Sequence, residues 1–304
     1  MLGDKIKKLR YALGNYINFD SIMRNQLIIQ KYHEYAYESS EKGISEKFNE
    51  KNRPLIISLT TYSKRIYEVY LVIESIFRQT VKPDKVILWL SEDEFEYDNL
   101  PIVLQIQEQR GLEIRFCKDL RSYKKLLFTI MDYVDSDIIT VDDDFIYPRD
   151  FIENLLNTSR KYPTCVCYYR GSRILLKNKQ IVPYAKWIES EEEYEPSLLN
   201  FATGAGGIFY PKGCFCKSVL DVDILLNLAP SADDIWFKSM TLMNGVKYVK
   251  VSSPYPFEYN FISLNNMQDI ALWHKNVEQN QNDSQLKSVF NVYHLFEMLL
   301  EEEY

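Results

Sequence analysis

Residues 136–148 of this chain, SDIITVDDDFIYP, place a run of three carboxylates, Asp142–Asp144, directly after a short apolar segment. Residues Ile138–Val141 are mostly β-branched, which favours a strand buried on both faces, and Pro148 prevents the next segment from continuing it. We therefore expect the carboxylates at the carboxyl end of a buried strand. Ligands bind at this edge of open α/β sheets, and aspartate oxygens are suitable ligands for Mg²⁺ or Mn²⁺. The pattern predicts a metal ion that holds a diphosphate.

The alternative interpretation of this acidic run is a solvated turn, which is the commoner structure for such a run in isolation. Three features of the context favour a site. An apolar strand precedes the run, the hydrophobic residues Phe145–Tyr147 follow it, and a second acidic pair, Asp233 and Asp234, stands far downstream.

Composition indicates a folded globular protein with enough apolar residues for one large domain or two small ones, since 46% of the 304 residues are hydrophobic and 26% are charged. No apolar run approaches the roughly 18 to 20 residues that span a bilayer, and the N-terminus lacks the apolar core of a signal peptide. We therefore expect a cytoplasmic protein. The net charge of -7 argues against a nucleic acid as partner, because a phosphate backbone requires a basic surface.

The first residues, MLGDKIKKLR, combine basic and apolar side chains at helical spacing. A helix of this kind could make peripheral contact with the anionic inner face of the plasma membrane, although a plain terminal helix is the simpler interpretation. The basic residues are Lys5, Lys7, Lys8 and Arg10, and the apolar ones are Leu2, Ile6, Leu9 and Leu13.

The cysteines form two Cys-x-Cys pairs and one single residue: Cys117, Cys165, Cys167, Cys214 and Cys216. A four-thiolate zinc site is conceivable, but structural zinc sites usually space their ligands by two to four residues. Cys165 and Cys167 also lie in a strand-like context. Reduced and mostly buried thiols in a reducing compartment are the better interpretation.

Strands and helices are expected to alternate after a helical N-terminal region of about 50 residues, in which Gly43 would end a long helix. Such alternation predicts βαβ units and an α/β, Rossmann-like, mainly parallel sheet flanked by helices. The expected strands are residues 55–62, 85–91, 112–117 and 138–144, and the expected helices are residues 66–79, about 100–109, and 123–134.

After Asp150 the pattern changes to short strands, a glycine-rich loop, a helix over 232–245, and a last amphipathic helix near 284–302. We expect a helical extension (1–50), one continuous domain (51–283) and a C-terminal helix (284–304). Within the domain, residues 51–150 would bind a donor and residues 151–283 an acceptor. The absence of Gly-x-Gly-x-x-Gly after the first strand and of a Walker motif excludes the common dinucleotide and P-loop phosphate sites.

The chain resembles the GT-A glycosyltransferases, in particular bacterial family-2-like transferases of surface polysaccharide assembly. The resemblance covers residues 54–283 and rests on ordered motifs: SLTTYSKRI, QTVKPDKVILWLSEDEF, RSYKKL, TVDDDFIYP, TGAGGIFYP and ADDIWFK. It implies an enzyme that uses Mn²⁺ or Mg²⁺ and moves a sugar from a nucleoside diphosphate sugar, with a UDP-sugar preferred. The acceptor would be a saccharide or a lipid-linked saccharide, as in capsule or lipopolysaccharide assembly, and the transfer would invert the anomeric configuration.

By this resemblance the loop after the first strand looks like the nucleotide pocket. Thr60, Thr61, Tyr62 and Arg65 offer hydroxyls, an aromatic face and a cation there, although Tyr62 could equally well only pack. Glu92 or Asp93, after the second strand, would present an acid to the base or ribose, and the sequence does not choose between them.

The basic residues Arg121, Lys124 and Lys125 open the helix before the acidic strand and could bind phosphate, with plain solvent exposure as the alternative. In the acidic run, which matches the family's DXD motif, Asp142 would face the ribose and contribute to the metal site, and Asp144 would ligate the metal. Asp143 would help to bind the donor or only turn back into the fold.

The remaining site residues implied by the resemblance lie in the second half. Gly206 and Gly207 would allow an acceptor sugar to pass close to the backbone, with a tight corner as the alternative. Asp234 would be the catalytic base, with Asp233 second, although a helix-capping role is also open. His274 would be a further metal ligand or only a structural residue. Asn276, Asn282 and Asp283 look similar to a family motif to which we assign no role.

Two other functions remain open at this stage. A nucleotidyltransferase also uses a metal and carboxylates on an α/β sheet, but it would normally carry a glycine in the loop that reads SLTTYSKR here. A noncatalytic nucleotide- or sugar-binding module on the same fold is the other alternative. The presence of Asp142, Asp144 and Asp234 together argues against it.

Overall fold

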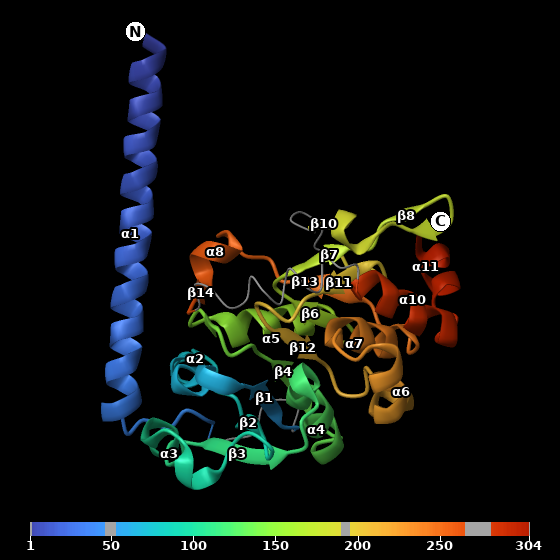
Figure 1. The fold of residues 1–304 in the computed structure, drawn as a ribbon, viewed down its shortest axis with the longest axis horizontal. Helices are drawn as coiled ribbons and strands as arrows, with labels where there is room; N and C mark the ends of the chain where they lie inside the picture. Colours follow the sequence, from blue (N-terminus) through green and yellow to red (C-terminus); the bar gives the residue numbers. More distant parts are fainter. Residues whose placement is uncertain (1, 46–52, 190–194, 265–280, 304) are drawn as a thin grey trace.

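The computed structural model describes residues 2–45, 53–189, 195–264 and 281–303. Its centre is a seven-stranded sheet with the order β13-β6-β12-β4-β1-β2-β3 (Figure 1). The strands of this sheet are β1 (Leu55–Thr60), β2 (Lys85–Ser91), β3 (Leu112–Cys117), β4 (Asp137–Thr140), β6 (Val166–Tyr168), β12 (Ile208–Tyr210) and β13 (Tyr248–Lys250). All neighbouring pairs are parallel except the two that involve β12. The expected α/β class with a mainly parallel sheet is therefore confirmed.

The order of the strands creates a switch point between β1 and β4. From β1 the chain adds β2 and β3 on one side, and then returns to place β4 on the other side of β1. Both neighbours of β1 run parallel to it, so the carboxyl ends of β1 and β4 lie next to each other, with Ser58 opposite Thr140. Ligand sites of open α/β sheets lie at such a switch point.

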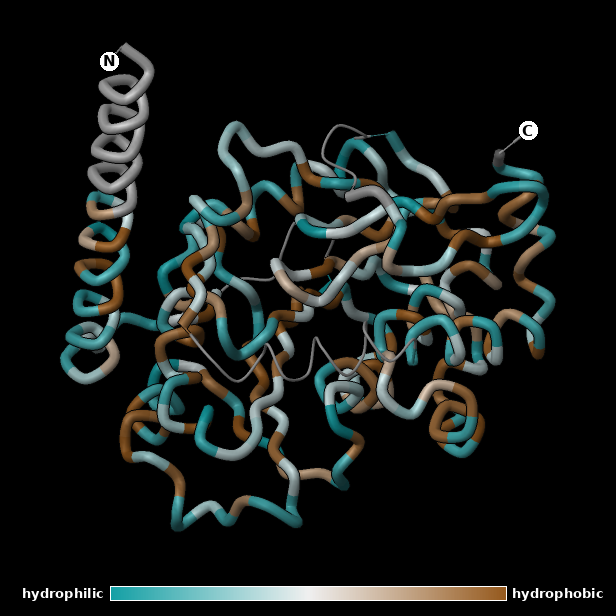
Figure 2. The backbone as a smooth tube through the Cα atoms, turned by 45° about the horizontal axis from the view of Figure 1, so that its top comes forward, coloured by the Kyte–Doolittle hydropathy of each residue, from teal (hydrophilic) through white to brown (hydrophobic). Residues whose placement is uncertain are grey.

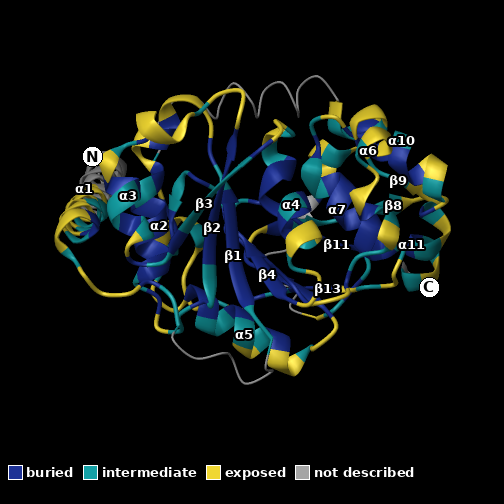
Figure 3. Ribbon diagram, turned by 90° about the horizontal axis from the view of Figure 1, so that it is seen from below, coloured by how far each residue is buried: buried dark blue, intermediate teal, exposed yellow. Residues whose placement is uncertain are grey.

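Helices cover both faces of the sheet, and the alternation of side chains along each strand explains this arrangement (Figure 3). Ile57 and Leu59 of β1 pack in a cluster with α2 (Val69–Phe77) and α5 (Phe151–Lys161), whereas Ile56 packs on the opposite face. Helices α4 (Lys124–Asp132) and α7 (Asp233–Leu242) belong to that second layer. Figure 2 shows hydrophobic segments gathered inside the body. The result is a three-layer α/β/α arrangement in which both faces of the sheet are buried.

The helices are α1 (Leu2–Glu38), α2 (Val69–Phe77), α3 (Ile102–Glu108), α4 (Lys124–Asp132), α5 (Phe151–Lys161), α6 (Val222–Leu228), α7 (Asp233–Leu242), α8 (Phe257–Asn260), α10 (Gln281–Tyr293) and α11 (Phe296–Glu303). Small sheets form from β5 (Phe145–Ile146) with β14 (Ile262–Ser263), from β8 (Leu176–Lys177) with β9 (Gln180–Ile181), and from β7 (Gly171–Arg173) between β10 (Ile188–Glu189) and β11 (Asn200–Ala202). No described helix is long and apolar enough to cross a membrane. The five cysteines carry free thiols, and all but the half-buried Cys216 are buried.

Two helix predictions were wrong: one helix ends earlier than expected, and the other is interrupted. Helix α1 ends at Glu38 rather than at Gly43, and the Ser39 hydroxyl accepts a hydrogen bond from the backbone N–H of Glu41 at 3.2 Å. Such side-chain bonding competes with the helical pattern. Gly43 serves packing instead, because a Cβ atom there would lie 2.0 Å from the ring of Phe77. The single C-terminal helix is two helices, separated where His294 adopts a φ of 53°.

Candidate active site

One residue, Val141, separates the acidic loop, Asp142–Asp144, from the end of β4 at Thr140. The backbone N–H of Val141 still bonds to the carbonyl oxygen of Ser58 in β1 at 3.1 Å. The next N–H, that of Asp142, donates to the hydroxyl oxygen of Tyr147 at 2.8 Å. Side-chain and backbone bonds of this kind fix the direction in which each carboxylate leaves the sheet edge.

The three carboxylates have different surroundings. Asp142 accepts a hydrogen bond from Lys125 Nζ at 2.6 Å, and its side chain is 25% exposed. Asp143 is buried and binds Arg65 Nη1 at 2.5 Å and Thr61 Oγ1 at 2.6 Å. Asp144 lies 3.3 Å from Arg65 Nη1. Asp143 therefore turns back into the fold, and Asp142 and Asp144 are the partly exposed members of the run.

Arg65 is not available to a nucleotide in the way the sequence predicts, because it is buried and bridges Asp143 and Asp144. Its guanidinium carbon lies 5.1 Å from the centre of the Tyr62 ring, whose residue is 37% exposed. The arginine thus ties the acidic loop to the loop after β1. Tyr62 keeps an exposed aromatic face beside it.

Asp233 and Asp234 form the first turn of α7. The residue before the helix is Ala232, so neither aspartate occupies the N-cap position that the alternative interpretation would require. Asp234 Oδ2 accepts a hydrogen bond from the backbone N–H of Gly204 at 3.2 Å. Lys125 Nζ lies 3.7 Å from Asp233 Oδ2 while it also binds Asp142. A single ammonium group thus connects the acidic loop and the start of α7.

The pKa values of Lys125 and Asp234 are both raised, for different reasons. Burial lowers the pKa of Lys125, but Asp142, Asp233 and Asp234 together outweigh this effect and raise it, so the side chain stays charged. Burial and the neighbouring carboxylate of Asp233 raise the pKa of Asp234 above its usual range, against the opposing effect of Lys125. A raised pKa makes a carboxylate a stronger proton acceptor, which suits general acid–base chemistry.

Asp142, Asp233 and Asp234 line one open cavity of about 500 Å³, whereas Asp144 is not among its lining residues. Asp142 stands on the side of the sheet edge, and Asp233 and Asp234 stand on the side of α7. Aromatic, basic and backbone groups complete the wall: Lys125, Arg170, Tyr184, Trp187, Thr203, Gly204 and Asn282 lie among its lining residues. Tyr184 is itself held by Asp283, whose Oδ1 accepts the Tyr184 backbone N–H at 2.8 Å.

The glycine-rich loop contributes a different glycine from the predicted ones. A Cβ atom on Gly206 would lie 2.5 Å from the Phe257 ring, and one on Gly207 would lie 2.5 Å from the Phe151 ring. Both residues have positive φ, so the tight corner that was the alternative interpretation describes them. Gly204 is the member of the loop at the cavity, because a Cβ atom there would lie 3.1 Å from Lys125 Nζ.

Several other predicted residues lie elsewhere. Glu92 and Asp93 are exposed and line a separate cavity of about 490 Å³. Thr60 Oγ1 donates to the carbonyl oxygen of Trp89 at 2.8 Å, which fixes the loop. Arg121 is exposed and donates to the carbonyl oxygen of Pro230 at 3.2 Å, outside the cavity lining. His274 and Asn276 lie outside the described residues, as do the side chains of residues 1–18.

Among the cavity residues that sequence reasoning missed are Arg170, Tyr184 and Trp187. Arg170 lies between β6 and β7, Tyr184 begins a 3₁₀ turn over Tyr184–Lys186, and Trp187 follows this turn, so no periodicity marks them. An arginine and two aromatic residues near each other in sequence were the available signal, because such residues are common in binding sites.

A divalent metal fits the chemistry of the acidic loop. Mg²⁺ is usually held by one or two carboxylates together with phosphate oxygens and water, and Asp142 and Asp144 supply two such carboxylates. Among the described residues no group of three or more His, Cys, Asp or Glu side chains could hold a metal alone. The remaining ligands would have to come from a bound phosphate compound and from water.

No protein-family model matches this chain, and no curated protein sequence does. Among solved structures, the chain is similar to the mannosyltransferase PcManGT from Pyrobaculum calidifontis in complex with GDP-Man and Mn²⁺, with 12% identity, a TM-score of 0.50, and coverage of 96% of this chain and 80% of that chain. S. aureus TarS 1-349 in complex with UDP matches with 12% identity, a TM-score of 0.47, and coverage of 82% and 70%. The sheet order and the likeness to the mannosyltransferase show that the chain has a GT-A-like fold.

Proposed function

We propose that this protein is a metal-dependent glycosyltransferase that moves a sugar from a nucleoside diphosphate sugar to a hydroxyl group of a saccharide acceptor. One observation carries the proposal. The carboxylates of Asp142 and Asp234 line one cavity together with Lys125, which binds Asp142, at the switch point of the sheet. The mannosyltransferase of similar fold is described with GDP-Man and Mn²⁺, which agrees with a nucleotide-sugar donor.

On the donor side, Asp142 and Asp144 would hold Mn²⁺ or Mg²⁺, which when bound supplies positive charge to the departing diphosphate. Lys125 stays protonated and would donate to a phosphate oxygen from the wall of the cavity. Thr61 and Arg65 act indirectly, because they hold Asp143 and so position the acidic loop. The exposed ring of Tyr62 is available to stack on the base.

On the acceptor side, Asp234 would take the proton from the acceptor hydroxyl. That oxygen forms a bond to the anomeric carbon while the bond from this carbon to the diphosphate oxygen breaks, and the electron pair leaves with the diphosphate. The Gly204 N–H orients this carboxylate, and Asp234 lines the same cavity as Asp142, so the acceptor hydroxyl and the donor would meet there. We therefore propose an inverting single displacement. Retained configuration in the product, determined by NMR, would rule it out.

The sugar ring of either substrate would pack on Tyr184 and Trp187, whose rings lie 4.6 Å apart between centres at the cavity. A UDP-sugar donor, a lipid-linked acceptor, a role in capsule or lipopolysaccharide assembly, and membrane contact through the N-terminal helix remain parts of the proposal. They depend on contacts with the substrate or on residues 1–18, whose side chains are outside the described part.

Calorimetric titration of UDP, GDP, CMP and their sugars, with and without Mn²⁺, tests the donor side. We expect metal-dependent binding of one nucleotide class, weakened at least about ten-fold in Asp144→Ala because a metal ligand is lost. Asp135→Asn is the matched control, since its carboxylate is 76% exposed and binds only Lys212. Absence of nucleotide binding under every condition, or equal binding by Asp144→Ala and wild type, would refute the donor assignment.

The acceptor side is tested by Asp234→Asn. This variant is expected to bind the donor like wild type but to transfer sugar about 10² to 10⁴ times more slowly, because it lacks the base. Transfer and donor hydrolysis are measured in the same assay, so that a loss of donor binding is recognised. Transfer at the wild-type rate would assign the base elsewhere.

A further inference from the structure

A second cavity, of about 350 Å³, lies between α1 and the body of the protein, and its charge is opposite to that of the whole chain. Four of its lining residues are cations, Arg24, Lys31, Arg78 and Arg149, and none is Asp or Glu. The chain as a whole carries a net charge of -7. A local cluster of cations in an acidic protein produces a positive potential that attracts anions. We refer to this cavity as the basic cavity.

Most of these charges are not neutralised by a carboxylate. Lys31 and Arg149 are exposed and form no ion pair within the described part of the chain. Arg24 binds the carbonyl oxygen of Tyr259 through Nη2 at 2.6 Å, with its guanidinium carbon 3.9 Å from the centre of the Tyr259 ring. Only Arg78 has acidic partners. The cavity therefore presents positive charge beside tyrosine rings, a combination suited to an anionic ligand that also has a packing face.

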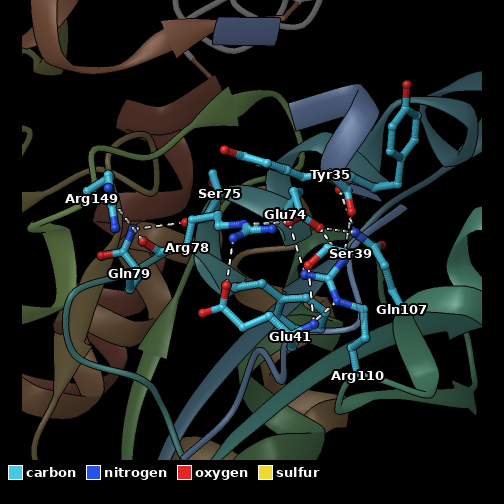
Figure 4. A network of polar contacts seen from close by, with 12 residues as sticks. Tyr35, Ser39, Glu41, Glu74, Ser75, Arg78, Gln79, Gln107, Arg110 and Arg149 are labelled. Carbon is cyan, nitrogen blue, oxygen red and sulfur yellow. Dashed lines mark hydrogen bonds and ion pairs between the residues drawn. The ribbon is translucent and has the colours of Figure 1, made fainter. Parts of the chain in front are cut away.

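The wall of the basic cavity is held in place by the polar network shown in Figure 4. Glu74 binds Arg78 Nε at 3.0 Å, Glu41 binds Arg78 Nη1 at 2.7 Å, and the guanidinium carbon of Arg78 lies 3.8 Å from the centre of the Tyr35 ring. Arg149 Nε donates to the carbonyl oxygen of Arg78 at 3.3 Å. These contacts order the cationic wall before any ligand arrives, which reduces the entropic cost of binding.

A third cavity, of about 440 Å³, has lining residues in common with both the basic cavity and the catalytic cavity. It shares Asn260 with the basic cavity, and it shares Arg170 and Gly171 with the catalytic cavity. Along this path the guanidinium carbon of Arg170 lies 5.5 Å from the centre of the Phe257 ring. A chain-like ligand that reached from Asp234 to Arg149 would pass along these three neighbouring cavities.

We propose that the basic cavity binds the far end of an anionic acceptor, a saccharide or polyol chain that carries phosphate or carboxylate groups. This inference rests on the proposed function, because it places the reacting hydroxyl of the same chain at Asp234. Guanidinium groups bind phosphate and carboxylate oxygens in pairs, and the lysine adds a point charge. Tyr32, Tyr35 and Tyr259 also line the cavity, and the uncharged parts of such a chain would contact them there.

The test compares a glycerol-phosphate tetramer, a uronic-acid tetrasaccharide and neutral maltotetraose by calorimetry on the full chain. At least one anionic oligomer is expected to bind, with an affinity that falls about ten-fold or more in the double variant Lys31→Gln/Arg149→Gln and decreases with added salt. Maltotetraose binding should not differ between the proteins. The control Lys118→Gln/Lys217→Gln removes two exposed charges outside all three cavities and should behave like wild type.

Three outcomes would overturn the inference: binding of neither anionic oligomer to wild type, equal loss in both double variants, or binding only to vesicles that contain phosphatidylglycerol. The last result would identify a lipid surface as the ligand of the basic cavity. The readout is independent of donor chemistry, so oligomer binding that depends on Lys31 and Arg149 without any sugar transfer would refute the proposed function and not the anion site. Sugar transfer without oligomer binding would refute only the anion site.

Discussion

Lys238 is a buried cation in α7, one turn after Asp234, and among the described residues no hydrogen-bond partner satisfies its Nζ atom. The ammonium nitrogen lies 3.9 Å from the centre of the Tyr248 ring. Burial lowers the pKa of Lys238 to about 7, against a small opposing effect of Glu302. In the unfolded chain the same group stays protonated up to a pH of about 10.4. The unfolded state therefore binds more protons between these two pH values.

It follows that the free energy of unfolding rises at this position as the pH rises from about 7 to about 10. Below pH 7 the folded protein bears the full cost of burying the protonated Lys238 side chain. Lys238→Met should raise the free energy of unfolding by a few kcal/mol at pH 6, and the gain should shrink toward pH 10. Chemical denaturation at several pH values measures this difference. A gain that does not depend on pH would show that packing, rather than the charge, is responsible.

At the residue scale, the sequence predicts the carboxylates of the site better than their partners. Asp142 and Asp234 could be predicted because each follows a recognisable pattern, a β-branched strand in one case and the start of an amphipathic helix in the other. The pairing of Arg65 with Asp143 spans 78 positions, and no local pattern distinguishes a buried arginine from an exposed one. Gly204 was missed for the same reason, because only its surroundings separate it from Gly206 and Gly207.

At the scale of elements, the buried carboxylate of Glu74 joins three helices. It binds Arg110 Nη1 at 2.7 Å, just after α3, and Arg78 Nε at 3.0 Å at the end of α2. Arg110 in turn donates to the carbonyl oxygens of Tyr35 in α1 and of Glu41 after it. Glu74→Gln should lower the free energy of unfolding by about 3–5 kcal/mol, because it leaves the buried guanidinium of Arg110 without an opposite charge.

Thermal and urea unfolding measure this loss, and Glu38→Gln is the control, since Glu38 is exposed near the end of the same α1 helix. The control should change stability by no more than about 0.5 kcal/mol. Limited proteolysis offers a second readout, because a weakened network should expose residues 39–45, which follow α1. Similar effects of the two substitutions would mean that the network contributes little to the attachment of α1.

In the first half of the chain, the sequence predicted whether each element is a helix or a strand. It did not predict the residues at which elements end. The strands near residues 55, 85, 112 and 138 follow clear apolar patterns, and each is present. The break between α10 and α11 has no such signal, because no glycine or proline occurs between residues 284 and 302. The chain turns there at His294, a residue that adopts positive φ only at some energetic cost. Tertiary packing therefore decides the position of this turn.

At the scale of the whole molecule, the two halves of the predicted domain, divided after residue 150, share one sheet. Strand β12, from the second half, pairs antiparallel with β4 on one side and with β6 on the other. If the chain were cut after residue 150, β4 would lose this neighbour, and the apolar side chains that pack under α7 would be exposed. An unpaired sheet edge and exposed apolar side chains would both destabilise such a fragment. We therefore infer that neither half is a separate folding unit.

We therefore expect the full chain to unfold in one cooperative transition in urea, with the same midpoint by circular dichroism and by tryptophan fluorescence. The isolated fragment 53–150 should show no cooperative transition, because it contains only four strands of the central sheet and lacks the layer formed by α7. Mixing it with the fragment 151–304 should restore the transition at least in part, which distinguishes a missing partner from damage caused by the cut. Fragment 53–150 alone could instead unfold in a sharp transition, with a dependence of its free energy of unfolding on urea concentration in proportion to its size. That result would make residues 53–150 an independent domain to which the second half is attached.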